Sequence, residues 1–152
     1  MQIETERLIL RPFQPEDGEG LYEYLSDAEV VRYEPYTPMS PEEAREEAGR
    51  RAKNNDFWAV CKKDGQLIGN LYFSKGDFNT WELGYVFNRK YWGNGYASES
   101  AQALLDVAFR EWDVRRVVAM CDPKNTASWR LMERLGMRRE GVLKQNVYFF
   151  CN

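Results

Sequence analysis

Polar and apolar positions along this chain follow two spacings, one of two residues and one of three to four, which predict alternating strands and helices. Residues 5–11 are typical of an opening strand that ends at Pro12, because proline cannot continue a hydrogen-bonded ladder. A helix is expected from Pro15 to about Asp27, since proline at the first helical position already has the φ angle of the helix.

Ser40, Pro41 and Glu43 mark the start of a second helix. Ser40 is the expected N-cap, and Glu43 stands where its side chain can bond back to the cap in a capping box. We expect this helix to run to about Lys53.

Two strands, at 57–62 and 67–73, are predicted on either side of a tight turn. The turn contains Asp64-Gly65 between apolar runs, a strong hairpin pattern because glycine accepts the positive φ that such turns need.

The second half of the chain is predicted as strand, helix, strand, helix and strand, at 81–87, 97–112, 116–120, 126–135 and 142–150. A crossover as long as the first of these helices joins parallel neighbours, so the strands on either side of it should be parallel. The sequence therefore predicts an α/β fold in a single domain covering residues 1–152.

The composition excludes several classes of protein. With 21 Lys and Arg against 24 Asp and Glu, the net charge is −3, so no nucleic-acid partner is expected. A hydrophobic content of 43% excludes a disordered chain. No apolar run is long enough to span a bilayer, so we expect no membrane partner.

The chain contains no histidine, and its three cysteines, Cys61, Cys121 and Cys151, are far apart. Ser-His-Asp and Cys-His triads and histidine-based metal sites are thereby excluded, and we expect no metal. Widely spaced cysteines fit reduced thiols better than disulfides, which predicts a cytoplasmic protein. Any chemistry must then come from carboxylates, hydroxyls and backbone dipoles.

The segment 88–98 contains Gly93 and Gly95 between an apolar strand and a long amphipathic helix. Glycines here let consecutive N–H groups point outward at a helix N-terminus, an anion site suited to a pyrophosphate. A plain strand-to-helix turn is the alternative interpretation. A Walker A loop is excluded because Tyr96 follows Gly95. A Rossmann loop fits poorly because Cys121, and not an acidic ribose ligand, stands at the end of the next strand.

Three motifs, in the right order, resemble those of the GNAT acetyltransferase superfamily. The first resembles its acyl-CoA pyrophosphate loop and reads Lys90-x-x-Gly93-x-Gly95-x-Ala97. The second is similar to its next motif and reads Asn125-x-x-Ser128-x-x-Leu131-x-x-x-x-Gly136. The third resembles the opening of the RimJ/RimL-like branch, the ribosomal-protein N-terminal acetyltransferases and their relatives, and reads Thr5-x-Arg7-Leu8-x-Leu10-Arg11.

The resemblance implies a mixed, mostly antiparallel sheet with flanking helices, in which the parallel strands 81–87 and 116–120 splay apart. It also implies acetyl-CoA as co-substrate, with the pantetheine arm in the gap between these strands. Asn125 and the backbone of three strand residues would contact the arm, namely Tyr85, Val86 and Phe87. The loop would hold the pyrophosphate through Lys90, Gly93, Asn94, Gly95, Tyr96, Ala97 and Ser98.

The implied reaction is attack of a neutral amine on a thioester carbonyl. An amine with a pKa of about 8 to 10 is mostly protonated at neutral pH, so a base must remove a proton. Glu82 matches the position where relatives carry their proposed base and would act through water; a solvated strand carboxylate is the alternative.

The leaving thiolate of this reaction would lie near Ser128. Many relatives have a tyrosine as general acid four residues later, but this chain has Met132, which cannot donate a proton. Either Ser128 or water therefore serves as the acid. The other interpretation of Ser128 is a helix N-terminal residue that bonds to the backbone.

The acceptor is expected to be a primary amine, on a protein N-terminus or a small molecule. Glu34 and the acidic residues of 42–47 could attract a cationic acceptor, although most of that stretch fits a solvated helix face. Aromatic residues could form the wall of its pocket, with core packing as the alternative, namely Tyr33, Tyr36, Trp58, Tyr72 and Trp81.

We expect direct transfer without an acyl-enzyme, because neither Cys61 nor Cys121 has a sequence neighbour that would lower its pKa. The alternative is a catalytically silent acyl-CoA-binding or sensing module, and a nucleotide-binding protein that uses the same loop is a remote third. Relatives end in a hairpin of which this chain shows only the first strand. An unpaired edge at 147–150 would predict a homodimer or an unstable chain.

Overall fold

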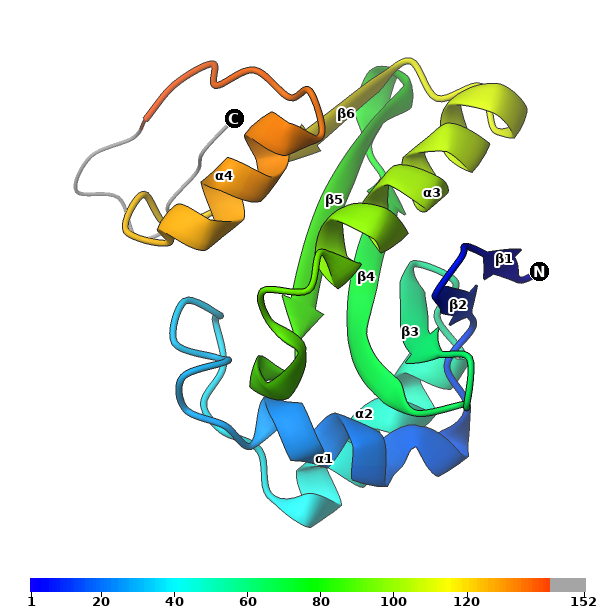
Figure 1. Cartoon of the computed structure of the whole chain (residues 1–152), viewed down its shortest axis with the longest axis vertical. Helices are drawn as coiled ribbons and strands as arrows, with labels where there is room; N and C mark the ends of the chain where they lie inside the picture. Colours follow the sequence, from blue (N-terminus) through cyan, green and yellow to red (C-terminus); the bar gives the residue numbers. More distant parts are fainter. Residues whose placement is uncertain (143–152) are drawn as a thin grey trace.

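The computed structural model describes residues 1–142, which form a six-stranded sheet with helices on both faces (Figure 1). The strands are ordered β1-β2-β3-β4-β5-β6 across the sheet. The predicted α/β class is therefore confirmed. The strand expected at 142–150 lies outside the described residues except for Val142.

The N-terminal residues form two short strands, β1 (Ile3–Glu4) and β2 (Leu8–Arg11), paired antiparallel. The prediction of one continuous strand at 5–11 is wrong, because Thr5 makes a tight turn. Its backbone N–H donates to the carbonyl of Leu8 at 3.0 Å, and its hydroxyl accepts from the N–H of Leu8 at 2.9 Å.

Two helices, α1 (Gly18–Leu25) and α2 (Pro41–Ala52), follow β2. The first is shorter than predicted, because Pro15–Asp17 form a 3-10 turn before it. The capping box of α2 is confirmed: Glu43 N–H donates to Ser40 Oγ at 3.1 Å, and Ser40 N–H donates to Glu43 Oε1 at 3.0 Å.

The centre of the sheet is an antiparallel meander of β3 (Phe57–Lys62), β4 (Leu67–Lys75) and β5 (Thr80–Phe87). Gly65, in the β3–β4 turn, has a φ of +94°, as the hairpin prediction requires.

The long helix α3 (Tyr96–Glu111) then crosses the sheet to β6 (Arg116–Ala119), which pairs parallel with β5 as predicted. Helix α4 (Thr126–Arg134) follows β6, and Gly136 comes just after its end with a φ of +85°.

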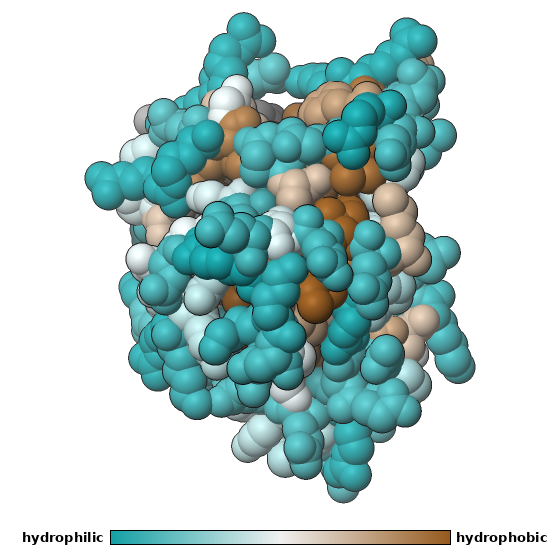
Figure 2. Space-filling view, turned by 45° about the vertical axis from the view of Figure 1, so that its right-hand side comes forward, coloured by the Kyte–Doolittle hydropathy of each residue, from teal (hydrophilic) through white to brown (hydrophobic). Residues whose placement is uncertain are grey.

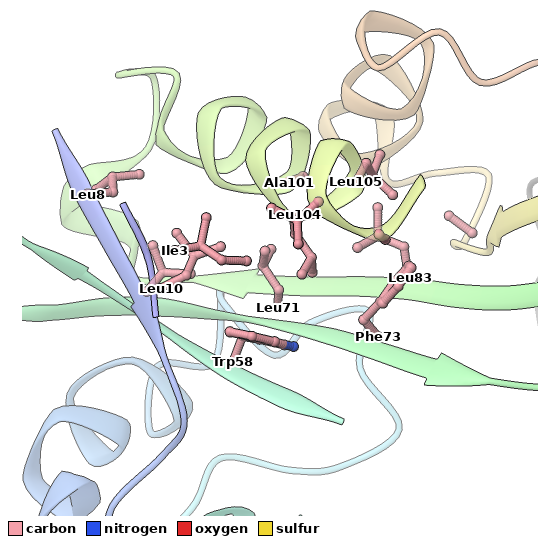
Figure 3. Close-up of a cluster of buried hydrophobic side chains, with 14 of the residues drawn as sticks. Ile3, Leu8, Leu10, Trp58, Leu71, Phe73, Leu83, Ala101, Leu104 and Leu105 are labelled. Carbon is pink, nitrogen blue, oxygen red and sulfur yellow. The ribbon is translucent and has the colours of Figure 1, made fainter. Parts of the chain in front are cut away.

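Two hydrophobic clusters fill the two faces of the sheet. Side chains of β2 to β5 pack under α3 on one face, and Figure 3 shows Leu71 and Leu83 of the sheet next to Leu104 and Leu105 of α3. On the other face, α1 and α2 cover the alternate positions of β3, Ala59 among them.

Trp58 and Trp81 belong to the α3 face, where they stack with Trp112 at centroid distances of 6.1 and 6.2 Å. Trp58 is therefore buried in the core and the half-buried Trp81 packs against it, which is the core-packing alternative for these two residues. On the face shown in Figure 2, hydrophilic residues predominate and apolar surface is confined to small separate areas.

Candidate active site

Strands β5 and β6 are paired over only half of β5. Their register runs from Thr80 opposite Arg116 to Leu83 opposite Ala119 and ends there, whereas β4 stays paired with β5 as far as Phe87. Within residues 1–142, no strand pairs with the β6-facing edge of residues 84–87. The edge of a strand can bind an extended ligand that accepts and donates hydrogen bonds, as an added strand does.

The loop after β5 leads into the N-terminus of α3 without a side-chain cap. Gly93 and Gly95 have φ angles of +81° and +79°, a conformation that side chains other than glycine adopt at a cost. A Cβ on Gly93 would meet nothing within 4 Å, so the glycine is needed for its φ and not for space.

The N-terminus of α3 differs from those of α2 and α4, which side chains cap, whereas α1 also has no side-chain cap. Ser40 caps α2 and Asn125 caps α4, but Gly95 at the N-cap of α3 has no side chain to bond the first N–H groups. These N–H groups and the positive end of the helix dipole favour a bound anion.

Two residues that the sequence analysis did not single out fix this loop to the sheet. Asn88 donates its N–H to the carbonyl of Ile68 at 2.8 Å and accepts the N–H of Lys90 on its side chain at 3.0 Å. Trp92 donates its indole N–H to the carbonyl of Phe87 at 2.8 Å. An asparagine directly after a strand, at the start of a turn, was the available signal for the first.

Lys90 and Asn94, both predicted to bind pyrophosphate, are engaged elsewhere. Lys90 Nζ lies 2.6 Å from Glu23 Oε1 on α1, and this hydrogen bond raises the pKa of the exposed lysine. Asn94 donates from its side-chain amide to the carbonyl of Tyr91 at 3.1 Å, so its side chain stabilises the loop.

An arginine from the N-terminal turn lies against the first turn of α3. Arg7 stacks over the ring of Tyr96 at 4.5 Å and donates to Glu99 at 2.7 Å. Burial alone would raise the pKa of Glu99, but hydrogen bonds from Thr5 and Arg7 hold it below its usual value. Ala97 and Ser98 lie in this same first turn, and Arg134 of α4 approaches Ser98 Oγ at 3.5 Å. Cations therefore lie on two sides of the uncapped terminus.

Glu82 lies on the paired half of β5, just before the splayed half. Its Cα partners are Ser74 of β4 and Val118 of β6, and the side chain is half-buried. Because neighbouring side chains on a strand alternate between faces, Glu82 points to the face opposite Leu83 and α3.

Ser128 and Asn125 lie together at the start of α4. The side-chain oxygen of Asn125 accepts the N–H of Ser128 at 3.3 Å, so Asn125 is the N-cap of this helix. The Ser128 hydroxyl is 2.9 Å from the phenol oxygen of Tyr85, which also donates to the Ser128 carbonyl at 2.8 Å. Met132, one turn later, is buried in the core.

Comparisons with known proteins agree with this geometry. The sequence matches the acetyltransferase (GNAT) domain family over residues 7–138. The chain belongs to the GNAT acetyltransferase family. The uncharacterized N-acetyltransferase YnaD of Bacillus subtilis is 40% identical over 97% of this chain and 88% of its own length.

Solved structures and ribosomal-protein enzymes are also among the GNAT relatives. A crystal structure of a GNAT-family acetyltransferase from Bacillus anthracis has a TM-score of 0.92 at 38% identity, covering 99% of this chain and 94% of its own. The [ribosomal protein uS5]-alanine N-acetyltransferase of Escherichia coli is 27% identical over 95% of this chain and 81% of its own length. The RimL/RimJ-like relationship predicted from the opening motif is therefore confirmed.

Two further properties of residues 1–142 concern metal sites and membrane spans. In the described part of the chain, no group of three histidine, cysteine or carboxylate side chains could hold a metal ion. No helix between residues 1 and 142 has the length and apolar character needed to cross a membrane.

The loop between α1 and α2, residues 26–40, faces the start of α4 in the GNAT fold of this chain (Figure 1). Tyr33 donates its phenol proton to the carbonyl of Lys124 at 3.4 Å, which links this loop to the β6–α4 connection. Burial raises the pKa of Glu34 to about 6 and that of Tyr36 to about 12. Within the predicted acidic acceptor set, the pKa of Glu34 is thus raised, whereas that of Glu43 and that of Glu47 are lowered.

We predict that Glu34→Gln stabilises the folded chain at neutral pH by at most about 2 kcal/mol and gives no gain near pH 4. Burial raises the pKa of Glu34 from 4.5 to about 6, and Arg51 offsets only part of this. The folded chain then binds the Glu34 proton more tightly than the unfolded chain. The free energy of unfolding should accordingly fall as pH rises from about 4.5 to about 6.

Urea unfolding of Glu34→Gln at several pH values tests this expectation. Glu29→Gln, an exposed carboxylate in the same loop, is the control and should stay within about 0.5 kcal/mol of the wild type at every pH. A pH-independent difference between Glu34→Gln and the wild type would contradict the assignment.

Proposed function

We propose that this GNAT chain transfers the acetyl group of acetyl-CoA to a primary amine. The observation that carries the proposal is the edge of β5 beyond Leu83, where pairing with β6 ends, together with the uncapped N-terminus of α3 that follows it in the chain. The edge suits an arm that contains amide groups, and the helix terminus suits a diphosphate. Coenzyme A has both parts, joined in this order.

The proposal gives a task to the backbone of β5, to the loop before α3 and to Glu82. The backbone of Tyr85, Val86 and Phe87 would bind the pantetheine arm, and the N–H groups of 93–98 would hold the diphosphate. Bound acetyl-CoA supplies the activated acyl group. Glu82 would take a proton from the acceptor amine through water, and a backbone N–H of β5 would stabilise the oxyanion that develops on the carbonyl.

Direct transfer from acetyl-CoA to the amine is favoured over an acyl-enzyme. Burial raises the pKa of the Cys61 thiol, so at neutral pH it stays protonated and is a poor nucleophile. Cys121 is also buried. The hydroxyl of Ser128 has no histidine to activate it in this chain.

The acceptor that we propose is a protein N-terminus or a small amine in the cytoplasm. One relative acts on the alanine of ribosomal protein uS5, and the half-buried carboxylate of Glu34, whose pKa is raised, lies in the 26–40 loop, where a cationic amine would neutralise it. The homodimer expected from the sequence stays a prediction, which light scattering can test.

Gly95→Val is expected to weaken acetyl-CoA binding by about tenfold or more. Valine at a φ of +79° costs about 1–2 kcal/mol, and the strain is relieved only by moving the N–H groups that would hold the diphosphate. A Cβ there would be 3.6 Å from Arg7 Nη2, an ordinary contact, so the variant should still fold.

Isothermal titration with acetyl-CoA measures this effect. Gly65→Val is the matched control, because Gly65 also has a positive φ but lies in the β3–β4 turn. The control should lose similar stability and keep wild-type affinity. Equal affinities for all three proteins would place the diphosphate elsewhere.

The silent acyl-CoA-binding module remains a second candidate, favoured by Met132 at the position where many relatives have a tyrosine. A panel of amines and amino-terminal peptides, assayed for free thiol, separates the two. Binding of acetyl-CoA without thiol release from any acceptor favours the module.

A further inference from the structure

Tyr85 does more than present its backbone to the edge of β5. Its phenol oxygen lies 2.8 Å from the carbonyl of Ser128 and 2.9 Å from the Ser128 hydroxyl. Tyr85 is therefore in direct contact with the hydroxyl predicted to lie near the thioester sulfur.

The position of this contact follows from the splay. Tyr85 lies two residues beyond Leu83, where pairing with β6 ends, and Ser128 lies in the first turn of α4. The phenol thus reaches from the open half of β5 to the helix that follows β6. A ligand arm between β5 and β6 would pass close to this pair of hydroxyls.

The proton positions allow the pair to act in series. A carbonyl only accepts, so when the phenol donates to the Ser128 carbonyl, the Ser128 hydroxyl donates back to the phenol. When the phenol instead donates to Ser128 Oγ, the Ser128 proton is free to point to a third atom. A small rotation of two hydroxyl groups converts one state into the other.

We propose that Tyr85 is a positioning residue that donates through Ser128 to the leaving sulfur, where Met132 supplies no donor. The inference rests on the proposed acetyl transfer. As the C–S bond breaks, its electron pair stays on sulfur as a thiolate. Ser128 donates a hydrogen bond to that sulfur while Tyr85 donates one to Ser128. The amine proton leaves through Glu82 and water, and solvent later protonates the thiolate.

The first turn of α4 adds to this stabilisation. The N-terminus of a helix favours negative charge, and Ser128 lies at its third residue. Asn125 already bonds the Ser128 N–H, so the hydroxyl is the group of Ser128 that is left for the sulfur. Two hydroxyls in series also polarise each other, which strengthens the bond to an anion.

The test compares coenzyme A with desulfo-coenzyme A by isothermal titration across pH, beside steady-state kinetics. In the wild type, the affinity for coenzyme A divided by the affinity for the desulfo compound should increase about tenfold between about pH 7 and about pH 9. The thiol of coenzyme A becomes a thiolate over this range, and the hydrogen bond from Ser128, supported by Tyr85, favours the thiolate. Tyr85→Phe should lose most of this gain and lower kcat about tenfold at unchanged KM.

Three further variants make the result specific. Ser128→Ala should lower kcat by about 10²-fold, and the double variant should be no slower than Ser128→Ala alone, because the two hydroxyls act as one unit. Tyr22→Phe, an exposed phenol on α1, should match the wild type throughout.

The outcomes are distinguishable. If the wild type fails to bind coenzyme A, both the proposed function and the proposed role of Tyr85 are overturned. If the wild type turns over normally and Tyr85→Phe keeps both kcat and the pH-dependent preference for the thiol, only the proposed role of Tyr85 is overturned. If Tyr85→Phe changes only KM or the melting temperature, Tyr85 is a structural link between β5 and α4. This result would also overturn its proposed role in the transfer.

Discussion

Glu82→Gln is expected to slow acetyl transfer by about 10²–10⁴-fold and to leave the dissociation constant of acetyl-CoA unchanged. The acceptor amine is mostly protonated at neutral pH, and glutamine cannot take its proton. The glutamine amide has nearly the shape of the carboxylate, and Glu82 points to the face of β5 opposite α3. The N-terminus of α3 that would hold the diphosphate should therefore stay intact.

The pH dependence of the residual rate of Glu82→Gln shows whether Glu82 acts in the removal of the amine proton. With the base removed, the rate of Glu82→Gln should keep rising with pH as more of the amine becomes neutral. Glu140→Gln is the control, since this exposed carboxylate pairs with Arg116 at the start of β6. Turnover of Glu82→Gln within about threefold of the control would remove Glu82 from the role of base.

Arg51→Ala is expected to lower the free energy of unfolding by about 3–5 kcal/mol. Arg51 is only 4% exposed and donates to Glu47 at 2.7 Å and to Asn70 at 3.1 Å. Tyr24 donates to the same Asn70 oxygen at 2.7 Å, and the guanidinium lies 4.3 Å from the centroid of the Phe57 ring. Removing Arg51 leaves the carboxylate of Glu47 without its buried partner between α2 and the sheet.

The neighbouring residue gives a matched comparison for this prediction. Arg50 bonds the same Glu47, also at 2.7 Å, but its side chain is 63% exposed. Arg50→Ala should therefore cost less than about 1 kcal/mol in a denaturant titration. Similar losses for the two variants would show that the network under α2 contributes little.

Sequence patterns predicted the elements whose cause is local. The capping box at Ser40, the hairpin at Gly65 and the glycine loop at 93–95 each depend on a few consecutive residues. The order of strands and helices and the parallel pair then followed from the length of the crossover. The turn at Thr5 was missed because residues 5–11 keep an apolar pattern through a break in the backbone.

Contacts between distant residues were not predictable in the same way. Tyr85 and Ser128 are 43 residues apart, and only the splay of β5 from β6 brings them together. The pairing of Lys90 with Glu23 depends on where α1 packs, which no spacing in the sequence reveals. The stacking of Trp58 and Trp81 on Trp112 likewise depends on which face of the sheet α3 covers.

In the proposed function, the acyl donor is bound by main-chain atoms of β5, whereas the acceptor meets side chains of the 26–40 loop such as Glu34. Substituting residues of that loop should therefore retarget the protein to new amines without loss of its acyl donor. If the backbone binds the donor and the side chains of this loop bind the acceptor, the specificity for each substrate can evolve independently.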